Sequence, residues 1–334
     1  MLRSRIFIWL GCSVLAACIG WAYSQTSGGN VHIGMATGLL IGASILGLEL
    51  FVVHRPIGAP IRRLPLPIFL IVSSIAWVLI IYTVLVSVTP LLTTEQAYGD
   101  DYTATSLRQD LVFALIVSLV FNAALRVRSL AGSRVLLNFL LGRYHRPLRE
   151  SRIFMFLDVA ESTKLAEQLG DEQVQSLIGR FFFDIATPIA HYGGETHRYI
   201  GDEVVVTWTL ARGQRQANCL ECVRAISRLM HEQETVYQRR FGVVPRFRAG
   251  LHCGEVVAGE VGDDKREIVY FGDTINTTAR IAAYCKDTGK DLLVSQALLN
   301  HVDLPKGVAI HSLGPVQLRG KRDAIEVVSL SFPD

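Results

Sequence analysis

Two aspartates lie at the ends of predicted strands in the C-terminal half of the chain, and their carboxylates could share a metal ion. Asp158 ends a short, almost unbroken apolar run over 153–157, a pattern typical of a buried strand. Asp202 lies beside Gly201 at the tip of a predicted hairpin over 195–209. If this hairpin pairs with the first strand, two carboxylates meet at one edge of the sheet and repel each other. A divalent cation relieves this repulsion, and proteins typically hold Mg²⁺ by one or two carboxylates plus substrate phosphates.

The segment after Asp158 is suited to binding phosphate. The chain turns there directly into a predicted helix beginning near Ser162 and Thr163, and the N-terminus of a helix favours negatively charged phosphate. Taken alone, however, Asp158 and Asp202 are better explained as a capping residue and a turn residue. The choice between a metal site and ordinary structural positions therefore depends on the other motifs of the chain.

The remaining pattern of this half predicts an α+β fold. After the first strand we expect two helices, over 162–169 and 172–191, the second capped by Asp171. The further expected elements are strands at 195–200 and 203–209, a long amphipathic helix over about 214–240, strands near 246–252, 254–261 and 266–271, and a helix starting near Asp273. A strand, helices, two strands, a helix and further strands make up an α+β arrangement.

The composition of the whole chain indicates a membrane protein. Half of the 334 residues are apolar and 19% are charged, against roughly 25% charged residues in a typical soluble domain. This excludes a disordered chain, a disulfide-rich miniprotein and an ordinary soluble enzyme. Four long apolar runs stand out, at 6–23, 31–53, 66–88 and 111–125. A bilayer-spanning helix needs about 20 apolar residues, so we expect four transmembrane helices, of which the first and fourth are the shorter.

The distribution of charge sets the expected orientation of these spans. Residues 1–150 contain 12 arginines, no lysine and six acidic residues, whereas residues 151–334 carry a net negative charge. Basic segments precede the first span, separate the second from the third, and follow the fourth, which places both termini in the cytoplasm. We therefore expect a multi-pass protein of the inner (plasma) membrane, in contact with lipid and not with nucleic acid. The segment Leu15-Ala16-Ala17-Cys18 also looks like a bacterial lipoprotein cleavage motif, although the apolar run continues past it.

These observations divide the chain into three parts. Residues 1–125 form the expected four-helix membrane domain, residues 126–150 a juxtamembrane helical linker, and residues 151–334 the α+β domain. Within the linker, residues 135–141 are apolar at helical spacing, and Pro147 is expected to end the helix. The linker either couples a signal and pairs subunits or acts as a passive tether.

Four segments of the C-terminal part together resemble the catalytic domain of class III adenylate and guanylate cyclases. They are Phe156-Leu157-Asp158-Val159 with Ser162-Thr163, Tyr199-Ile200-Gly201-Asp202-Glu203, Arg248-Ala249-Gly250-Leu251-His252-Cys253-Gly254 and Phe271-Gly272-Asp273-Thr274-Ile275-Asn276-Thr277-Thr278-Ala279-Arg280. The segments occur in order over about 151–330. The resemblance implies a ferredoxin-like βαββαβ core with added strands. It also implies a head-to-tail homodimer whose active sites lie at the subunit interface.

The resemblance also assigns roles to individual residues. Asp158 and Asp202 match the two metal-binding aspartates, which implies two Mg²⁺ or Mn²⁺ ions in each active site. Thr163, Arg248 and Arg319 match substrate-binding positions, and the two arginines are the ones that contact the phosphates.

The implied reaction is intramolecular, with the ribose 3′-oxygen attacking the α-phosphorus while pyrophosphate leaves in line. Asn276 and Arg280 match the pair that the other subunit supplies to the transition state. Their i, i+4 spacing puts both on one helix face. Arg280 would neutralise charge on the α-phosphate, a role that arginine often has in phosphoryl transfer, and Asn276 would orient the ribose. One chain holds both sets of residues, so a homodimer completes two equivalent sites.

Two positions that select the base in this family are unusual here. Arg198 stands where adenylate cyclases usually carry lysine, and Val269 stands where the family usually carries Asp, Thr, Ser or Cys. Arg198 can donate to adenine N1 or to guanine O6 or N7, but the side chain of Val269 accepts no hydrogen bond from adenine N6. The acidic acceptor expected for guanine is absent, so we expect ATP as substrate and cyclic AMP as product. The alternatives are a guanylate or promiscuous cyclase, and a catalytically silent cyclase-like signalling module.

Overall fold

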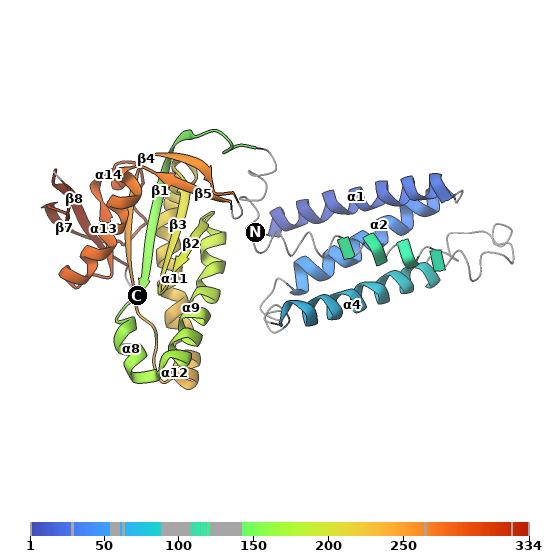
Figure 1. The fold of residues 1–334 in the computed structure, drawn as a ribbon, viewed down its shortest axis with the longest axis horizontal. Helices are drawn as coiled ribbons and strands as arrows, with labels where there is room; N and C mark the ends of the chain where they lie inside the picture. The colour runs from blue at the N-terminus through green and yellow to red at the C-terminus, as the bar shows by residue number, and fades with distance from the viewer. Residues whose placement is uncertain are drawn as a thin grey trace. The chain divides into compact units, whose positions relative to one another are not determined.

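The computed structural model describes most of the chain, which forms two compact units. The described residues are 2–27, 30–53, 61, 64–87, 108–109, 111–113, 115–117, 119–120, 142–263, 266–321 and 323–332. The two units comprise Met1–Ala131 and Gly132–Asp334. In Figure 1 the first unit is drawn in blue to teal, and the second runs from green through yellow to red.

The first unit contains long apolar helices. They are α1 (Leu2–Ser27), α2 (Val31–Leu48), the π-helical continuation η1 (Glu49–Val53) and α4 (Leu66–Ser87). Among the described residues, two helical stretches, Val31–Val53 and Pro67–Ser87, are long and apolar enough to cross a membrane. They hint at a membrane anchor. The first expected span coincides with α1, but only parts of the fourth, 111–125, are described, so four spans stay a prediction.

Helices α1 and α2 pack closely through small residues. A Cβ atom added to Gly20 would lie 2.1 Å from the carbonyl oxygen of Gly34, and one added to Gly38 would lie 2.5 Å from the carbonyl oxygen of Ala16. Small residues that let backbones approach are typical of helix pairs in membranes. Cleavage at the lipoprotein-like motif would remove Ala16 and, with it, part of this contact.

The second unit is built on an eight-stranded sheet. Its strands are β1 (Leu148–Val159), β2 (Glu195–Ile200), β3 (Glu203–Thr209), β4 (Phe247–Val261), β5 (Glu267–Phe271), β6 (Leu292–Ser295), β7 (Ala309–Val316) and β8 (Ile325–Ser331). The strand order is β2-β3-β1-β4-β6-β8-β7, with β5 paired to β4. β1 is antiparallel to both β3 and β4, and β4 is parallel to β6. The order β2-β3-β1-β4, with helices after β1 and β3, is the ferredoxin-like core that the sequence predicts.

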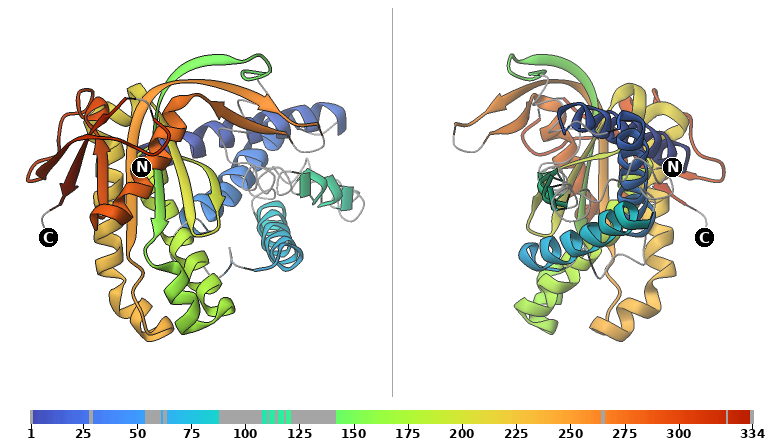
Figure 2. Two further views of the ribbon diagram at one scale, coloured as in Figure 1. Left: turned by 60° about the vertical axis from the view of Figure 1, so that its left-hand side comes forward. Right: turned by 90° about the vertical axis from the view of Figure 1, so that its right-hand side faces the viewer.

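Helices cover both faces of this sheet (Figures 1 and 2). They are α8 (Ser162–Leu169), α9 (Asp171–His191), α10 (Leu210–Gln214), the 3₁₀ turn η4 (Arg215–Ala217), α11 (Asn218–Glu232), α12 (Glu234–Phe241), α13 (Asp273–Thr288) and α14 (Gln296–Leu299). On one face, Phe181 of α9 and Ile226 of α11 are buried in a cluster with Ile153 of β1. On the other face, Ala282 of α13 is buried with Phe154 of β1. Alternate residues of a strand face opposite sides, so coverage of both faces explains the unbroken apolar run in β1.

Two details of the predicted helices are wrong. The helix expected over about 214–240 is interrupted twice. Gln216 and Ala217 adopt left-handed backbone conformations with φ of 52° and 54°, so α11 begins only at Asn218. Gln233, with a non-helical ψ of 1°, separates α11 from α12. The apolar periodicity hides this second break because α11 and α12 bury residues in the same core cluster. Asp171 does not cap α9: it is the first residue of the helix, and Gly170 occupies the capping position.

One detail of the predicted strands is also wrong. The strands expected at 246–252 and 254–261 form a single strand, β4. Gly254 lies inside this strand because α13 comes close to it. A Cβ atom at Gly254 would lie 2.6 Å from Oγ1 of Thr274. The glycine therefore allows a helix to approach and does not end the strand.

The chain ahead of β1 is already part of the folded second unit. β1 begins at Leu148, and the preceding Tyr144 is 4% exposed. The carbonyl oxygen of Tyr144 accepts a hydrogen bond from the N–H of Glu260 in β4 (3.0 Å). The helix predicted over the linker lies mostly outside the described residues and stays a prediction.

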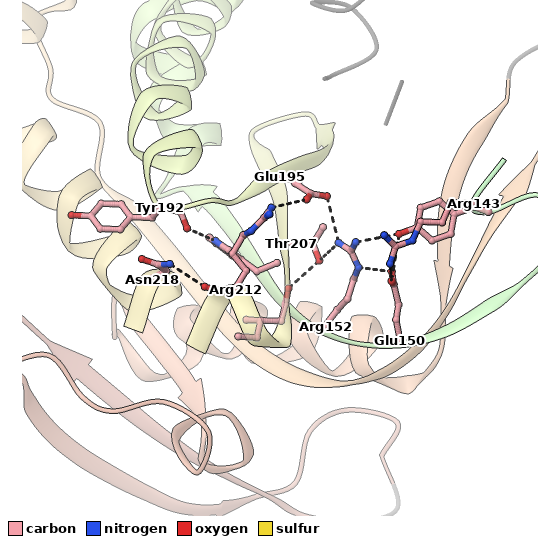
Figure 3. Close-up of polar contacts among 11 residues, drawn as sticks. Arg143, Glu150, Arg152, Tyr192, Glu195, Thr207, Arg212 and Asn218 are labelled. Carbon is pink, nitrogen blue, oxygen red and sulfur yellow. Dashed lines mark hydrogen bonds and ion pairs between the residues drawn. The ribbon is translucent and has the colours of Figure 1, made fainter. Parts of the chain in front are cut away.

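A buried arginine in β1 ties several elements of the second unit together (Figure 3). Arg152 is 2% exposed, and its Nε donates a hydrogen bond to Oε1 of Glu150 (2.6 Å). Its Nη1 donates to Oγ1 of Thr207 (3.3 Å) and lies 3.7 Å from Oε2 of Glu195. The guanidinium also lies over the ring of Tyr270, 4.8 Å from the centroid. β1, β2, β3 and β5 are thus joined by one charged side chain.

Candidate active site

Three strands bring the expected metal ligands to one end of the sheet. In the observed register, Asp158 of β1 lies opposite Glu203 of β3 and Arg248 of β4. Residues paired across neighbouring strands project to the same face, so these three side chains share one face. Asp202 directly precedes Glu203, and its carbonyl oxygen accepts a hydrogen bond from the N–H of Val159 (3.1 Å). The fold therefore brings Asp158 and Asp202 together.

The turn between β1 and α8 borders these carboxylates. Oγ of Ser162, the first residue of α8, donates a hydrogen bond to Oδ2 of Asp202 (2.5 Å). Glu161 adopts a left-handed conformation with φ of 58°, which lets the chain turn sharply from strand into helix. Thr163 is exposed in the first turn of α8. The helix N-terminus thus lies beside the carboxylates, at the place where the sequence predicts phosphate.

The carboxylates lie where the fold disfavours their negative charge. Burial raises the pKa of Asp158, and the charge of Asp202 adds to the shift, while Lys286 and Arg248 oppose it. Burial also raises the pKa of Glu203 to about 7, again with contributions from both aspartates. Oδ1 of Asp158 is buried and has no hydrogen-bond partner among the described residues. A buried polar atom without a partner costs free energy, so a ligand that binds this oxygen would offset that cost.

This donor set suits a divalent metal ion such as Mg²⁺. Carboxylate oxygens are the ligands that Mg²⁺ prefers, and it usually takes one or two of them together with water and substrate phosphates. Within the described part of the chain, no group of three His, Cys, Asp or Glu side chains could hold a metal. The site therefore fits a metal ion shared with a phosphate substrate and not a cage made by the protein alone.

Helix α13 carries the second set of expected site residues. Asn276 is exposed and Arg280 is half-buried. Lys286, in the last turn of the same helix, reaches the first set, with Nζ 3.7 Å from Oδ2 of Asp158. At about 1.5 Å per residue, Asn276 and Arg280 lie about 15 and 9 Å farther back along the helix axis. Within one chain, the two sets are therefore separated along α13.

The loop that carries Arg319 packs against the start of α13. Arg319 itself is exposed. A Cβ atom added to the next residue, Gly320, would lie 3.4 Å from Nη2 of Arg280. The ammonium group of Lys321 pairs with the carboxylate of Asp273, the first residue of α13. Arg319 and Arg280 thus belong to one group, which the Lys321–Asp273 pair helps to position.

The base-selecting position on β2 has an acidic neighbour that the sequence analysis missed. Nη2 of Arg198 donates a hydrogen bond to Oε2 of Glu267 on β5. Val269 lies two residues further along β5, and residues two apart on a strand share a face. An acidic side chain is thus present on this strand beside Arg198, two residues before the apolar Val269.

Two further residues near the carboxylates were not predicted, although the sequence carries a signal for each. Glu203 follows Asp202 and closes the predicted hairpin opposite Asp158. Lys286 lies four residues after Ala282, one helical turn along the face that packs on β4. These two positions can be assigned to the site only once the register of β1 against β3 and the contact of α13 with β4 are known.

The comparisons with known proteins agree with this geometry. Residues 148–331 match the model of the adenylate and guanylate cyclase catalytic domain. The chain is 36% identical over 321 residues to adenylate cyclase 2 of Rhizobium meliloti (strain 1021), across 95% of this chain and 88% of that protein. It is 26% identical over 184 residues to adenylate cyclase 1 of the same organism, across 54% of this chain and 27% of that protein. A bacterial light-regulated adenylyl cyclase shares the fold, with a TM-score of 0.55 at 21% identity over 70% of this chain and 67% of that one.

The chain therefore belongs to the family defined by the adenylate and guanylate cyclase catalytic domain. It is a class III cyclase, a phosphorus–oxygen lyase, as the four sequence segments predict. Class III cyclases generally use divalent metal ions, and dimerisation is typical of the family.

Proposed function

We propose that this protein is a membrane-anchored, homodimeric adenylate cyclase that converts ATP to 3′,5′-cyclic AMP and pyrophosphate for intracellular signalling. The observation that carries the proposal is the convergence of Asp158 and Asp202 around a buried carboxylate oxygen without a partner among the described residues. The choice of ATP rests on the 36% identity to a protein named adenylate cyclase over nearly the whole chain.

The reaction forms a bond between the ribose 3′-oxygen and the α-phosphorus and breaks the bond from that phosphorus to the pyrophosphate oxygen. Two Mg²⁺ or Mn²⁺ ions, when bound, would activate the attacking oxygen and offset charge on the phosphates. Asp158 and Asp202 would hold these ions, and Ser162 would keep the Asp202 carboxylate oriented. Arg248 and the first turn of α8, with Thr163, would bind the triphosphate.

The second set of residues would act on the active site of the partner subunit. Asn276 would orient the ribose and Arg280 would neutralise charge on the α-phosphate, with Arg319 beside it on the phosphates. Their separation from Asp158 along α13 supports a site shared between subunits. The exposure of Ile200 on β2 (51%) and of Phe271 on β5 (54%) supports an interface on these strands, because large exposed apolar side chains near a site often mark a contact.

Base recognition would depend on Arg198 and Glu267. Arg198 would donate to adenine N1, and the Glu267 carboxylate would accept a hydrogen bond from adenine N6 beside the apolar Val269. The same donor and acceptor could also pair with guanine O6 and N1–H. Glu267 therefore also favours a second candidate, a guanylate or promiscuous cyclase, and the product assay below separates the two.

The first unit would anchor the enzyme in the inner membrane as a multi-pass domain with both termini in the cytoplasm. Two described helical stretches have the required length and apolar character. The arginine-rich segments between the expected spans support the orientation.

The test is a product assay on the full-length chain, in native membranes and purified in detergent. ATP or GTP is supplied separately with Mg²⁺ and then with Mn²⁺, and cyclic AMP and cyclic GMP are measured. We expect cyclic AMP from ATP and little cyclic GMP from GTP. Cyclic GMP as the main product would favour the second candidate. Tight binding of a labelled nucleotide with no product under any condition would instead indicate a silent signalling module.

A further inference from the structure

A lysine to which the reaction above gives no role lies beside the metal-site carboxylates. Nζ of Lys286 is 3.7 Å from Oδ2 of Asp158, and the lysine side chain is 63% exposed while the aspartate side chain is 14% exposed. The positive charge of Lys286 also acts on Glu203. Lys286 therefore contacts the more buried Asp158 carboxylate from the solvent-exposed side of the site.

The packing of α13 on β4 fixes this position. A Cβ atom at Gly250 would lie 2.6 Å from Cα of Ala282, so helix and strand are in direct backbone contact there. Lys286 lies one turn after Ala282, about 6 Å along the helix. Arg248 lies two residues before Gly250, about 7 Å along the strand, and pairs with Asp158. Four residues forward along α13 and two residues back along β4 cover similar distances, so Lys286 lies level with Asp158.

The charge around the site explains what a lysine does there. Three carboxylates gather at this end of the sheet, from Asp158, Asp202 and Glu203. The charge of Asp202 makes ionisation of Asp158 more costly, and the charges of both aspartates do the same for Glu203. The cations that act on Asp158 are Lys286 from α13 and Arg248 from β4. Lysine is a compact charge on a flexible stem, so an exposed lysine can leave a carboxylate without any change in the backbone.

We propose that Lys286 is an internal counter-ion of the metal site, which neutralises Asp158 in the empty protein and is displaced from it when a divalent metal ion binds. The inference rests on the metal-binding role of Asp158 in the proposed function. Its consequence is that a metal ion without nucleotide binds weakly, because it must compete with a tethered cation.

Metal binding without nucleotide tests the competition directly. Mn²⁺ is titrated into the full-length chain in detergent, and free Mn²⁺ is followed by electron paramagnetic resonance. Coulomb energies at this distance are of order 1 kcal/mol or more even in water, so we expect Lys286→Met to bind Mn²⁺ about fivefold more tightly than the wild type. Lys286→Arg keeps the charge and should retain the wild-type affinity. Lys290→Met removes the same charge one turn further along the chain and should also retain it.

A double-mutant cycle tests the pairing itself. With EDTA present, Lys286→Met should lower the unfolding temperature of the catalytic domain, because the three carboxylates lose a counter-charge. In an Asp158→Asn background the same change should have a clearly smaller effect, because only the more distant carboxylates of Asp202 and Glu203 remain. Equal Mn²⁺ affinity in wild type and Lys286→Met, or equal destabilisation in both backgrounds, would overturn this inference alone. A wild-type chain that binds no Mn²⁺ with or without nucleotide would overturn the metal assignment together with it.

Discussion

Arg152 and Asp158 lie on the same face of strand β1, and the fold satisfies their charges very differently. Arg152 and Asp158 are six residues apart, about 20 Å along the strand. Arg152 is 2% exposed and has partners in Glu150, Thr207 and Glu195 (Figure 3). Asp158 is also largely buried, yet one of its oxygens has no hydrogen-bond partner among the described residues.

The difference separates a structural charge from a functional one. Nearly all buried polar groups in proteins find partners, so one that does not calls for an explanation. The Arg152 cluster is complete and needs nothing more. The Asp158 cluster holds three carboxylates and one buried oxygen without a partner among the described residues, so it fits the proposed metal site.

The largest expected effect is a loss of cyclase activity when an aspartate of the Asp158 cluster is changed. Asp158→Asn and Asp202→Asn should each reduce cyclic nucleotide formation by at least about 10²-fold, since losing even one contact that stabilises a transition state commonly costs that much. Stability without metal should be unchanged or higher, because each change removes a mutually repelling charge. The checks are product formation and thermal unfolding in EDTA. Retained activity in both variants would contradict the metal assignment.

The next effect distinguishes a cluster shared between subunits from one contained in a single chain. Asp202→Ala and Arg280→Ala chains should each be inactive alone. Mixed as heterodimers, they leave one site with both defects and one intact site, so about half of the wild-type activity should return by the symmetry of a two-fold dimer. Differently tagged chains purified in two steps give the heterodimer, and product formation is measured. Absence of recovery in such heterodimers counts against shared sites.

At the Arg152 cluster, substitution should lower the stability of the catalytic domain. Arg152→Met keeps much of the side-chain volume but takes the buried cation from Glu150 and Glu195, whose other cationic neighbours, Arg143 and Arg212, are more exposed. Removing one partner of a buried ion pair typically costs about 3–5 kcal/mol. We expect the catalytic domain to unfold at a markedly lower temperature, with Arg152→Lys in between because lysine lacks the planar fork. A variant as stable as the wild type would show that the cluster is not structural.

The sequence predicts the core of the fold and the two aspartates but not what surrounds them. The apolar run over 153–157 and the hairpin around Gly201 already place Asp158 and Asp202 at one edge, because strand pairing follows from local pattern. Lys286 could not be predicted, since its contact depends on α13 crossing β4 at Gly250. A glycine within a strand segment suggests from sequence that the strand is interrupted. Only the packed structure shows that the glycine lets a helix approach the strand.

Base recognition shows the same limit of sequence reasoning. Val269 occupies the expected position and is apolar, so the sequence predicts an incomplete pair. The structure adds Glu267, two residues earlier on the same strand, where Arg198 donates a hydrogen bond to it. In the proposed function this carboxylate would accept the hydrogen bond that the side chain of Val269 cannot accept. A register shift by two residues preserves the face of a strand, which position-by-position matching overlooks.

A smaller effect is therefore expected at this exposed pair. Glu267→Ala should lower kcat/KM for ATP about tenfold, a typical cost for one hydrogen bond to a charged group when partly exposed, while leaving the fold intact. Glu255→Ala removes an exposed glutamate from neighbouring β4 and serves as the control. Initial rates with ATP and GTP give the comparison. Unchanged kcat/KM values for both ATP and GTP would exclude Glu267 from base recognition.

The smallest expected effect is a dependence of stability on pH at the Arg152 cluster. His197 lies with its ring 5.0 Å from that of Tyr270, next to Arg152. Burial, aided by the charges of Arg198 and Arg152 and opposed by that of Glu267, lowers the pKa of His197 to about 4. The folded state therefore binds fewer protons than the unfolded state, in which the pKa is about 6.5, so stability is lost as pH falls from about 6.5 towards 4. At pH 5.5 the loss from this residue is on the order of 1 kcal/mol.

His197→Gln should remove that part of the pH dependence. Unfolding measured at pH 7.5 and pH 5.5 should show a smaller loss of stability in the variant than in the wild type. Part of the loss should persist, because burial also lowers the pKa of His252 to about 4. His231→Gln changes an exposed histidine and should keep the wild-type slope. If His197→Gln and the wild type lose equal stability, His197 is charged in the folded protein, and the Arg152 cluster is less closed to solvent than its contacts indicate.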